Sequence, residues 1–223
     1  MKKFTMLDAA AIVLWILPGA YLLYVYSSLP ATVPVHFGID GTPDRYGHKT
    51  EMLTGVFILM GASAFVYMLL NMLPAIDPKK MVKYGEATFQ KMALGLVLFL
   101  STLTIAIIFA TVNKGFRIDR LIYPIIGLLF AFIGNMMNSI KPNYFAGIRT
   151  PWALENPDNW KATHRLAGKL WFTGGIAITV AVLLLPATLG FIVFMSITGI
   201  LVLIPYIYSY LYFKKSQQPG HNS

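Results

Sequence analysis

The sequence predicts an all-α membrane protein, a polytopic bundle of six transmembrane helices, from its composition and the placement of its charges. Of its 223 residues, 57% are hydrophobic and only 12% are charged, about half the charge of an average soluble domain. Four windows contain no charge at all: 52–75, 92–113, 121–140 and 170–213. Uncharged apolar runs of about 18 or more residues are typical of membrane-spanning helices and are too long for barrel strands. Residues 1–223 are therefore expected to form a single membrane domain.

The apolar runs give the expected helices, near residues 7–28, 52–73, 92–112, 120–140, 168–186 and 189–212. The first run follows Lys2 and Lys3, as the apolar part of a signal peptide would. It continues past about 15 residues and lacks a small-residue cleavage site, so we expect a span that is retained.

The distribution of Lys and Arg predicts which side of the membrane each loop faces, because cytoplasmic loops carry an excess of both. With the N-terminus inside, thirteen of the 18 Lys and Arg residues fall on the inner side. Both termini are then cytoplasmic, residues 29–51 form an extracytoplasmic motif loop, and residues 141–168 form a cytoplasmic motif loop. The inner cations are Lys2, Lys3, Lys79, Lys80, Lys83, Lys91, Lys141, Arg149, Lys161, Arg165, Lys169, Lys214 and Lys215.

The net charge of +9 indicates membrane lipids as a partner, since basic residues beside spans face anionic headgroups. No basic run is long enough to favour nucleic acid. The chain has no cysteine, which excludes disulfides, thiolate metal sites and a cysteine nucleophile.

The outer loop carries far more polar and turn-forming sequence than a connector needs. Its "DGTPDRYG" segment predicts consecutive tight turns, and its glycines and Pro43 argue against a helix. Three interpretations stay open: turn-capping aspartates beside surface histidines, a metal site at His36, Asp44 and His48, or a recognition surface for an external ligand. The metal interpretation comes from a spacing of four residues, which would place potential ligands on one face of a helix. The residues with this spacing are His36, Asp40, Asp44 and His48.

The inner loop contains two helix starts. Thr150-Pro151 and Asn156-Pro157 each fit an N-cap followed by a first-turn proline. Two short helices in tandem are therefore expected, the second continuing towards the fifth span. Three of the four tryptophans lie in or beside this loop and suit an amphipathic segment at headgroup level: Trp152, Trp160 and Trp171.

The inner loop also gathers side chains that suit anion binding. Arg149 is the best single candidate, because a guanidinium binds a carboxylate through two hydrogen bonds and Lys does not. In the alternative interpretation, Arg149 neutralises the carbonyl ends of spans or pairs with Glu155 or Asp158. The other candidate cations are His164 and Arg165, and the candidate hydrogen-bonding groups are Asn143, Thr150 and Asn156.

The sequence gives little support for catalysis, and a membrane enzyme with a metal at His36, Asp44 and His48 is the less favoured alternative function. The chain lacks a glycine-rich phosphate loop, a His-Glu-x-x-His motif and a Gly-x-Ser-x-Gly elbow, so we expect no enzyme, no catalytic residue, no cofactor and no metal. No carboxylate lies in mid-span, where proton relays usually keep one. A weak echo between "FGIDGTP" and "AGIRTP", three spans apart, leaves a small-molecule or ion transporter with a three-plus-three inverted repeat as the alternative function.

Two stretches resemble a known family. "LPATVPVHFGIDGTPDRYGHK" resembles the N-terminal domain of unknown function found in the SdpI family of toxin immunity proteins. "NYFAGIRTPWALENPDNWKATHRLAGK" resembles the C-terminal signature of the same family, and the two motifs occur in the family's order. The matching residues are Pro34, His36, Gly41, Pro43, Asp44 and Lys49 in the first motif, and Gly147 to Trp152, Trp160, His164 and Arg165 in the second.

The resemblance implies an integral protein of the bacterial plasma membrane with several spans. The family's namesake protects producing cells from a secreted, membrane-active toxin peptide and signals by holding a transcriptional repressor at the membrane. An immunity protein would then meet a toxin peptide outside and a repressor inside. The candidate partner-binding residues are His36, Asp44, Arg45 and Lys49 in the outer loop, and Asn143, Arg149, Thr150, Trp152, Trp160, His164 and Arg165 in the inner loop.

Overall fold

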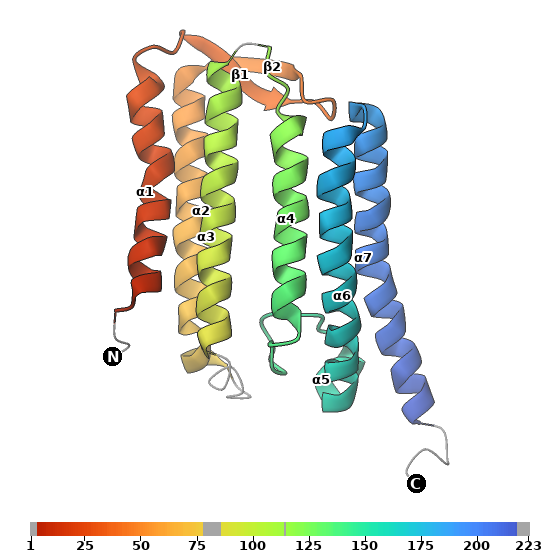
Figure 1. Ribbon diagram of the computed structural model, residues 1–223. Coiled ribbons are helices and arrows are strands. Elements are labelled where there is room, and N and C mark those ends of the chain that lie inside the picture. Colours follow the sequence, from red (N-terminus) through yellow and green to blue (C-terminus); the bar gives the residue numbers. More distant parts are fainter. Residues whose placement is uncertain (1–3, 78–85, 114, 218–223) are drawn as a thin grey trace.

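The computed structural model describes residues 4–77, 86–113 and 115–217, which form seven helices and two strands (Figure 1). Six of the helices are long and apolar enough to span a membrane, which confirms the predicted six-span, mostly helical fold. The elements are α1 (Met6–Tyr26), β1 (Thr32–Phe37), β2 (Pro43–His48), α2 (Lys49–Ile76), α3 (Glu86–Val112), α4 (Asp119–Met137), α5 (Pro151–Glu155), α6 (Pro157–Leu184) and α7 (Ala187–Ser216).

The long helices run up and down through one bundle. Figure 1 shows β1 and β2 lying across one end, here called the hairpin end. The opposite end, called the α5 end, contains α5, the start of α6, the start of α1 and the end of α7. That this end faces the cytoplasm stays a prediction from the charge distribution, part of which rests on lysines outside the described residues: Lys2, Lys3, Lys79, Lys80 and Lys83.

Several helices begin earlier than their apolar windows, because polar residues cap and extend them. The Thr5 hydroxyl accepts a hydrogen bond from the Asp8 amide, and the Asp8 carboxylate accepts one from the Thr5 amide. His48 and Glu51 form the equivalent capping box for α2. The fifth span starts at Pro157 rather than near 168, since the second tandem helix runs straight into it.

Close packing of α4 on α6 fixes the position of the inner motif. A Cβ added at Gly134 would lie 2.4 Å from the Phe172 amide nitrogen, and one at Gly175 would lie 2.4 Å from the Ala131 amide nitrogen. Small residues at a helix crossing allow the two backbones to touch, which is how spans often associate in lipid. Any larger side chain at Gly134 or Gly175 would push α6 away from α4.

Candidate functional site

The outer loop is a β-hairpin rather than the predicted run of turns. Strands β1 and β2 pair antiparallel, with a bulge where His36 faces Arg45. The turn is confined to residues 38–42, where the Gly38 amide donates to the Thr42 carbonyl at 2.8 Å. Val33 is completely buried under the hairpin, so the strand covers the apolar end of the helices. This tertiary contact explains why the turn-forming residues of β2 adopt an extended conformation.

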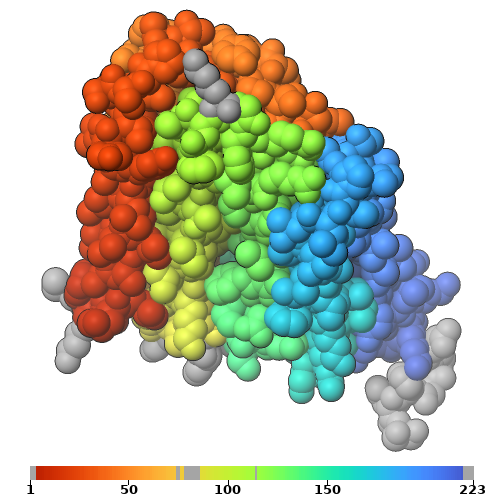
Figure 2. All heavy atoms as spheres, turned by 45° about the horizontal axis from the view of Figure 1, so that its top comes forward, coloured from red at the N-terminus to blue at the C-terminus, as the bar shows by residue number. Residues whose placement is uncertain are grey.

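The hairpin extends across the hairpin end of the bundle. In the space-filling view, its orange atoms reach from the α1 side towards the blue atoms of the C-terminal helices (Figure 2). The outer candidate residues lie on or beside this cover, and each has its own neighbour. His36 Nδ1 lies 2.6 Å from Asp44 Oδ1, Arg45 Nη1 lies 3.3 Å from Glu51 Oε2, and Lys49 Nζ lies 4.7 Å from the centroid of the Tyr26 ring.

The structure does not bring His36, Asp44 and His48 together, as the metal-site interpretation of the outer loop would require. His48 Nδ1 lies 2.9 Å from the Thr50 hydroxyl and caps α2, while His36 pairs with Asp44 alone. No group of three His, Asp or Glu side chains in the described ranges is placed to hold a metal ion. The hairpin geometry separates them, because residues of β1 and β2 pair across the ladder instead of stacking on one helix face.

The hairpin turn docks on the start of α4. The Ile118 amide donates to the Gly41 carbonyl at 3.2 Å, and the Tyr123 hydroxyl donates to the Ile39 carbonyl at 2.8 Å. Gly41 has a φ of 77°, and a Cβ there would lie 2.2 Å from Asp119 Oδ1. The turn therefore requires glycine both for its backbone conformation and for the space that Asp119 occupies.

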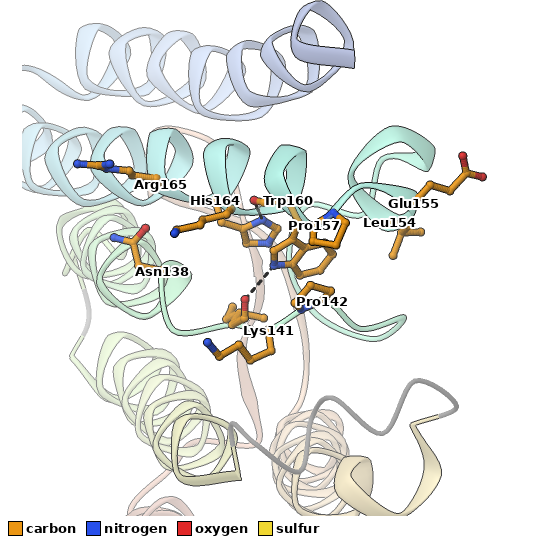
Figure 3. A pocket seen from close by; sticks show the side chains of 11 residues that line it. Asn138, Lys141, Pro142, Leu154, Glu155, Pro157, Trp160, His164 and Arg165 are labelled. Carbon is orange, nitrogen blue, oxygen red and sulfur yellow. Dashed lines mark hydrogen bonds between the residues drawn. The ribbon is translucent and has the colours of Figure 1, made fainter. Parts of the chain in front are cut away.

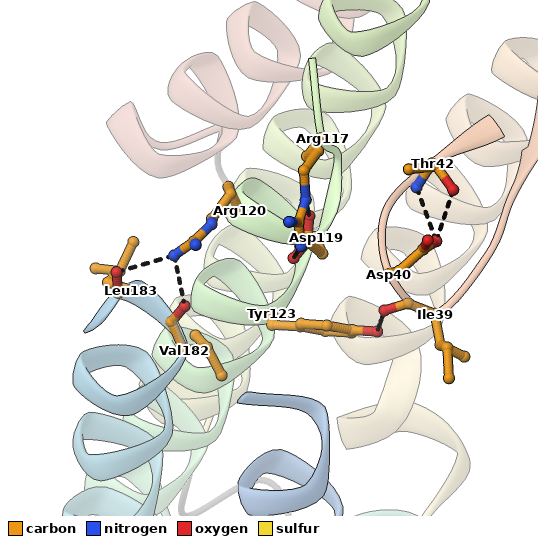
Figure 4. A network of polar contacts seen from close by, with 9 residues as sticks. All are labelled: Ile39, Asp40, Thr42, Arg117, Asp119, Arg120, Tyr123, Val182 and Leu183. Carbon is orange, nitrogen blue, oxygen red and sulfur yellow. Dashed lines mark hydrogen bonds and ion pairs between the residues drawn. The ribbon is translucent and has the colours of Figure 1, made fainter. Parts of the chain in front are cut away.

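A polar network at the start of α4 joins this contact to α6 (Figure 4). The Arg117 guanidinium donates twice to the buried Asp119 carboxylate, at 3.2 and 2.8 Å. One turn away, Arg120 Nη1 donates to the carbonyls of Val182 and Leu183, which end α6. A cation is favourable there because the last carbonyls of a helix lack intrahelical partners.

Two groups of the hairpin end have shifted pKa values. Hydrogen bonds from the Thr42 hydroxyl and amide lower the pKa of Asp40. Hydrogen bonding to Asp119 raises the pKa of Arg117. Sequence reasoning missed Arg117, Asp119 and Arg120 at the start of α4, although a cluster of charges directly before an apolar run was a signal that could have found them.

At the α5 end, the inner loop folds around Asn143, which is fully buried. Its Nδ2 donates to the carbonyls of Lys141 and Ala146, and its Oδ1 accepts from the amides of Phe145 and Ala146. The side-chain amide is thus fully used by the loop. Asn143 acts here as a positioning group, with no hydrogen-bonding capacity left for an anion.

His164 forms the second support of the loop. Its ring stacks on Trp160 with centroids 4.0 Å apart, Nδ1 donates to the Trp160 carbonyl at 2.9 Å, and Nε2 accepts from the Ile148 amide at 3.1 Å. A nitrogen that accepts a hydrogen bond carries no proton, so the ring is neutral in this arrangement. Gly147 has a φ of 107°, and a Cβ there would lie 2.4 Å from His164 Nε2.

Trp160 is not the headgroup anchor expected from the sequence. Its side chain is 2% exposed, and its indole nitrogen donates to the Ile140 carbonyl at 2.9 Å. Trp152 is half-buried and packs on aromatic rings of α7, the nearest being Tyr210 at 5.0 Å. The indole nitrogen of Trp171 donates to the Leu201 carbonyl of α7. The three tryptophans therefore bind the chain's own elements.

A buried polar network ties α5, α6 and α7 together. The predicted N-caps at Thr150 and Asn156 are confirmed, and the Thr150 hydroxyl also lies 2.6 Å from the Ser209 hydroxyl. Asn159 Oδ1 accepts from both Ser209 and Thr163, and Asn159 Nδ2 donates to the Ser209 carbonyl. Sequence reasoning missed Asn159, Thr163 and Ser209. The only local signal was the four-residue spacing of Asn159 and Thr163, which places both on one face of α6.

Arg149, unlike these residues, is exposed. Its guanidinium donates to the Tyr144 carbonyl. The ion pair with Glu155 or Asp158 that the alternative interpretation offered is not formed among the described residues. Arg149 therefore presents most of its donors to the surroundings at the α5 end.

Beside this network lies a cavity of about 720 Å³, the α5-end cavity (Figure 3). Trp160, His164 and Arg165 line it, so three of the inner candidates meet there. Arg149 and Thr150 are not part of its lining.

Comparison with known proteins matches two segments of this chain. Residues 139–209 match the SdpI/YfhL protein family, and residues 13–61 match a domain of unknown function, DUF1648. The chain is 24% identical over 199 residues to the immunity protein SdpI of Bacillus subtilis, covering 86% of this chain and 89% of that protein. The chain is an SdpI-like membrane protein.

The SdpI-like segment 139–209 contains the whole inner loop and every residue of the buried network. A second relative, an uncharacterized protein of Archaeoglobus fulgidus, is 50% identical over 44 residues, which covers 20% of this chain and 22% of that protein. No solved structure matches the chain. The resemblance stated from the two motifs is thereby confirmed, and the SdpI-like chain is a multi-pass membrane protein of bacterial type.

The transporter alternative rested on an echo between two segments that have different local structures in this chain. "FGIDGTP" forms the end of β1 and the hairpin turn, whereas "AGIRTP" forms the loop before α5. Gly38 has an ordinary negative-φ backbone, while Gly147 at the corresponding place has a φ of 107°. An inverted repeat would give equivalent segments the same local structure.

Proposed function

We propose that this chain is an immunity protein, which protects its host membrane from a secreted, membrane-active toxin peptide. The observation that carries the proposal is the alignment with an immunity protein over 86% of the chain. It spans both ends of the bundle, so it includes the hairpin and the inner loop together. The proposed role requires binding only, and no chemical step.

The hairpin end supplies a surface that suits a peptide. The exposed side chain of His36 pairs with Asp44, and that of Arg45 pairs with Glu51 at the start of α2, so positive and negative groups lie side by side. Such mixed charge matches the polar and charged side chains of an incoming peptide and directs its approach. The hairpin is also held to α4, so a bound peptide acts on a fixed platform.

The α5 end supplies a second surface, which we assign to a protein partner such as a transcriptional repressor. Arg149 projects from the inner loop next to two exposed aromatic side chains, Tyr144 and Phe145, which are 45% and 38% exposed. Arginine and aromatic residues carry much of the binding energy at protein interfaces. Signalling between the two ends would require two arrangements of the bundle that toxin and repressor favour differently.

The first experiment measures membrane potential in a toxin-sensitive bacterium that expresses the chain and receives an Sdp-type toxin peptide. The proposal predicts that the potential is retained with the wild-type chain. The double variant His36→Ala, Asp44→Ala should lose protection, because it removes an exposed pair without touching the buried Val33. A matched control is Lys214→Ala, which removes an exposed charge at the opposite end.

All variants must be compared at equal abundance in the membrane. Collapse of the potential with the wild-type chain would contradict immunity to that toxin class. Protection by the His36, Asp44 variant equal to that of the wild type would move the toxin contact away from the hairpin.

A further inference from the structure

The α5-end cavity gathers positive charge that no ion pair among the described residues compensates. Lys141, Lys161 and Arg165 line it, against a single carboxylate, Glu155. None of the three cations takes part in an ion pair within the described ranges. Figure 3 shows Lys141 and Arg165 with the side-chain amide of Asn138 between them in this view. An anion entering here would meet several donors and little repulsion.

Arg165 differs from the other arginines of the chain. Arg45 and Arg117 bind carboxylates, Arg120 binds the carbonyls that end α6, and Arg149 binds the Tyr144 carbonyl. Arg165 has no such hydrogen bond in the part of the chain that the structure describes. Its planar guanidinium can donate two parallel hydrogen bonds to two oxygens of a phosphate group, which the ammonium group of a lysine cannot do.

The depth of the cavity favours a lipid phosphate. Helix α6 has 28 residues, about 42 Å at 1.5 Å per residue, whereas the hydrocarbon core is about 30 Å thick. Its first turns are the polar ones, up to Arg165, and its uncharged run begins at Leu170. The cavity at these first turns therefore lies at the level of the headgroups.

The walls are suited to a molecule that is anionic at one end and apolar at the other. Ile140, Pro142 and Leu154 line the cavity with the buried Trp160 behind them. A second depression of about 420 Å³ shares Lys161 and Arg165 with it and is also lined by Lys169, Tyr212 and the carboxylate of Asp158. Lys161, Arg165 and Lys169 follow one another at four-residue intervals, so they form one basic stripe along α6.

We propose that the α5-end cavity binds the phosphate headgroup of an anionic phospholipid, with Arg165, Lys161 and Lys141 as its ligands and the Asn138 amide as a further donor. Phosphatidylglycerol has the required chemistry: a phosphodiester charge attached to acyl chains that the apolar wall and the bilayer accommodate. The site is separate from the proposed toxin and repressor surfaces, since it uses neither the hairpin nor Arg149.

The test uses the full-length chain purified in a zwitterionic detergent and titrated with short-chain phosphatidylglycerol, while its melting temperature is recorded. Short-chain phosphatidylcholine and inorganic phosphate are the two comparison ligands. The variant is Lys161→Gln, Arg165→Gln, and the matched control is Lys91→Gln, Lys215→Gln, which removes two exposed cations at the same end but outside the cavity. Each lost cation should weaken binding about 5-fold, and both together about 30-fold.

The expected result is a saturable rise in melting temperature with phosphatidylglycerol but not with phosphatidylcholine, kept by the control and lost by the variant. Equal loss in the control variant would overturn the site in favour of general surface charge. A rise of the same size with inorganic phosphate at the same concentration would overturn the lipid assignment. No difference between the two lipids for the wild-type chain would overturn the proposal altogether. All variants must melt at the wild-type temperature without ligand, as expected for exposed side chains.

Discussion

The hydroxyl groups of Thr150 and Ser209 lie 2.6 Å apart. This contact joins the N-cap residue of α5 to the C-terminal part of α7. Both side chains are buried, at 3% and 0% exposure. The same Thr150 oxygen accepts from the Ala153 amide as the N-cap of α5. One threonine therefore starts a helix and fastens it to a distant one.

Replacing Ser209 with alanine should lower the stability of the α5 end. The change leaves Thr150 and Asn159 with one hydrogen-bond partner fewer in a buried place, which costs about 1–3 kcal/mol. Thermal unfolding of the purified chain measures the effect. Thr173→Ala is the matched control, because that exposed hydroxyl bonds only to carbonyls of its own helix; an equal loss in both variants would contradict a special role for the network.

Gly147→Ala should disrupt the inner loop. The residue would have to keep a φ of 107° and place its Cβ 2.4 Å from His164 Nε2, and strained backbone of this kind costs about 1–3 kcal/mol before the steric clash is added. We expect faster hydrogen exchange at the amides of residues 145–148. Gly199→Ala, in a helix with open space around it, should leave exchange in this loop unchanged.

Gly41→Ala should release the hairpin turn from α4. Gly41 and Gly115 both have positive φ, 77° and 81°, but only Gly41 has neighbours within 4 Å of an added Cβ. The pair of variants therefore separates backbone strain from loss of the Asp119 contact. Gly41→Ala should speed hydrogen exchange at residues 38–42. Gly115→Ala should speed exchange near residue 115 by a smaller factor. Equal effects would show that docking on Asp119 contributes little.

The hairpin turn should loosen in acid. The pKa of Asp40 is lowered from its usual value of 3.8 by hydrogen bonds from Thr42. A group whose pKa falls on folding stabilises the folded state fully above its unfolded pKa, and this stabilisation is lost as the pH falls through the folded value. Exchange of the Thr42 amide, corrected for intrinsic rate, should therefore rise below about pH 4. In Asp40→Asn this pH dependence should disappear, and its persistence would point to another group.

The spans and the tandem helix starts could be predicted because their causes are local. Hydrophobic length defines a span within about 20 residues, and a cap such as Thr150 or Asn156 is recognised by its next few neighbours. The hairpin could not be predicted in the same way. Pro43–His48 carries turn formers and no alternating apolar pattern, and it becomes a strand because β1 and α4 offer it partners.

The sequence suggested candidate residues in the inner loop, but it did not predict how they are arranged. Trp160 and His164 have the composition of an exposed interfacial segment, yet they are buried because the loop around Asn143 folds over them. Ser209 lies in an apolar helix, and its partner Thr150 is 59 residues away. No local pattern encodes a contact of that kind, which depends on how α6 and α7 pack.

The contact between α4 and α6 has a mechanical consequence. Their backbones touch at Gly134 and Gly175, with no intervening side chains that could change rotamer and absorb a displacement. At the hairpin end, Arg120 holds the end of α6 and Tyr123 holds the turn. We therefore expect the two helices to move as one unit, so that a displacement of the hairpin is passed along α4 and α6 to the inner loop.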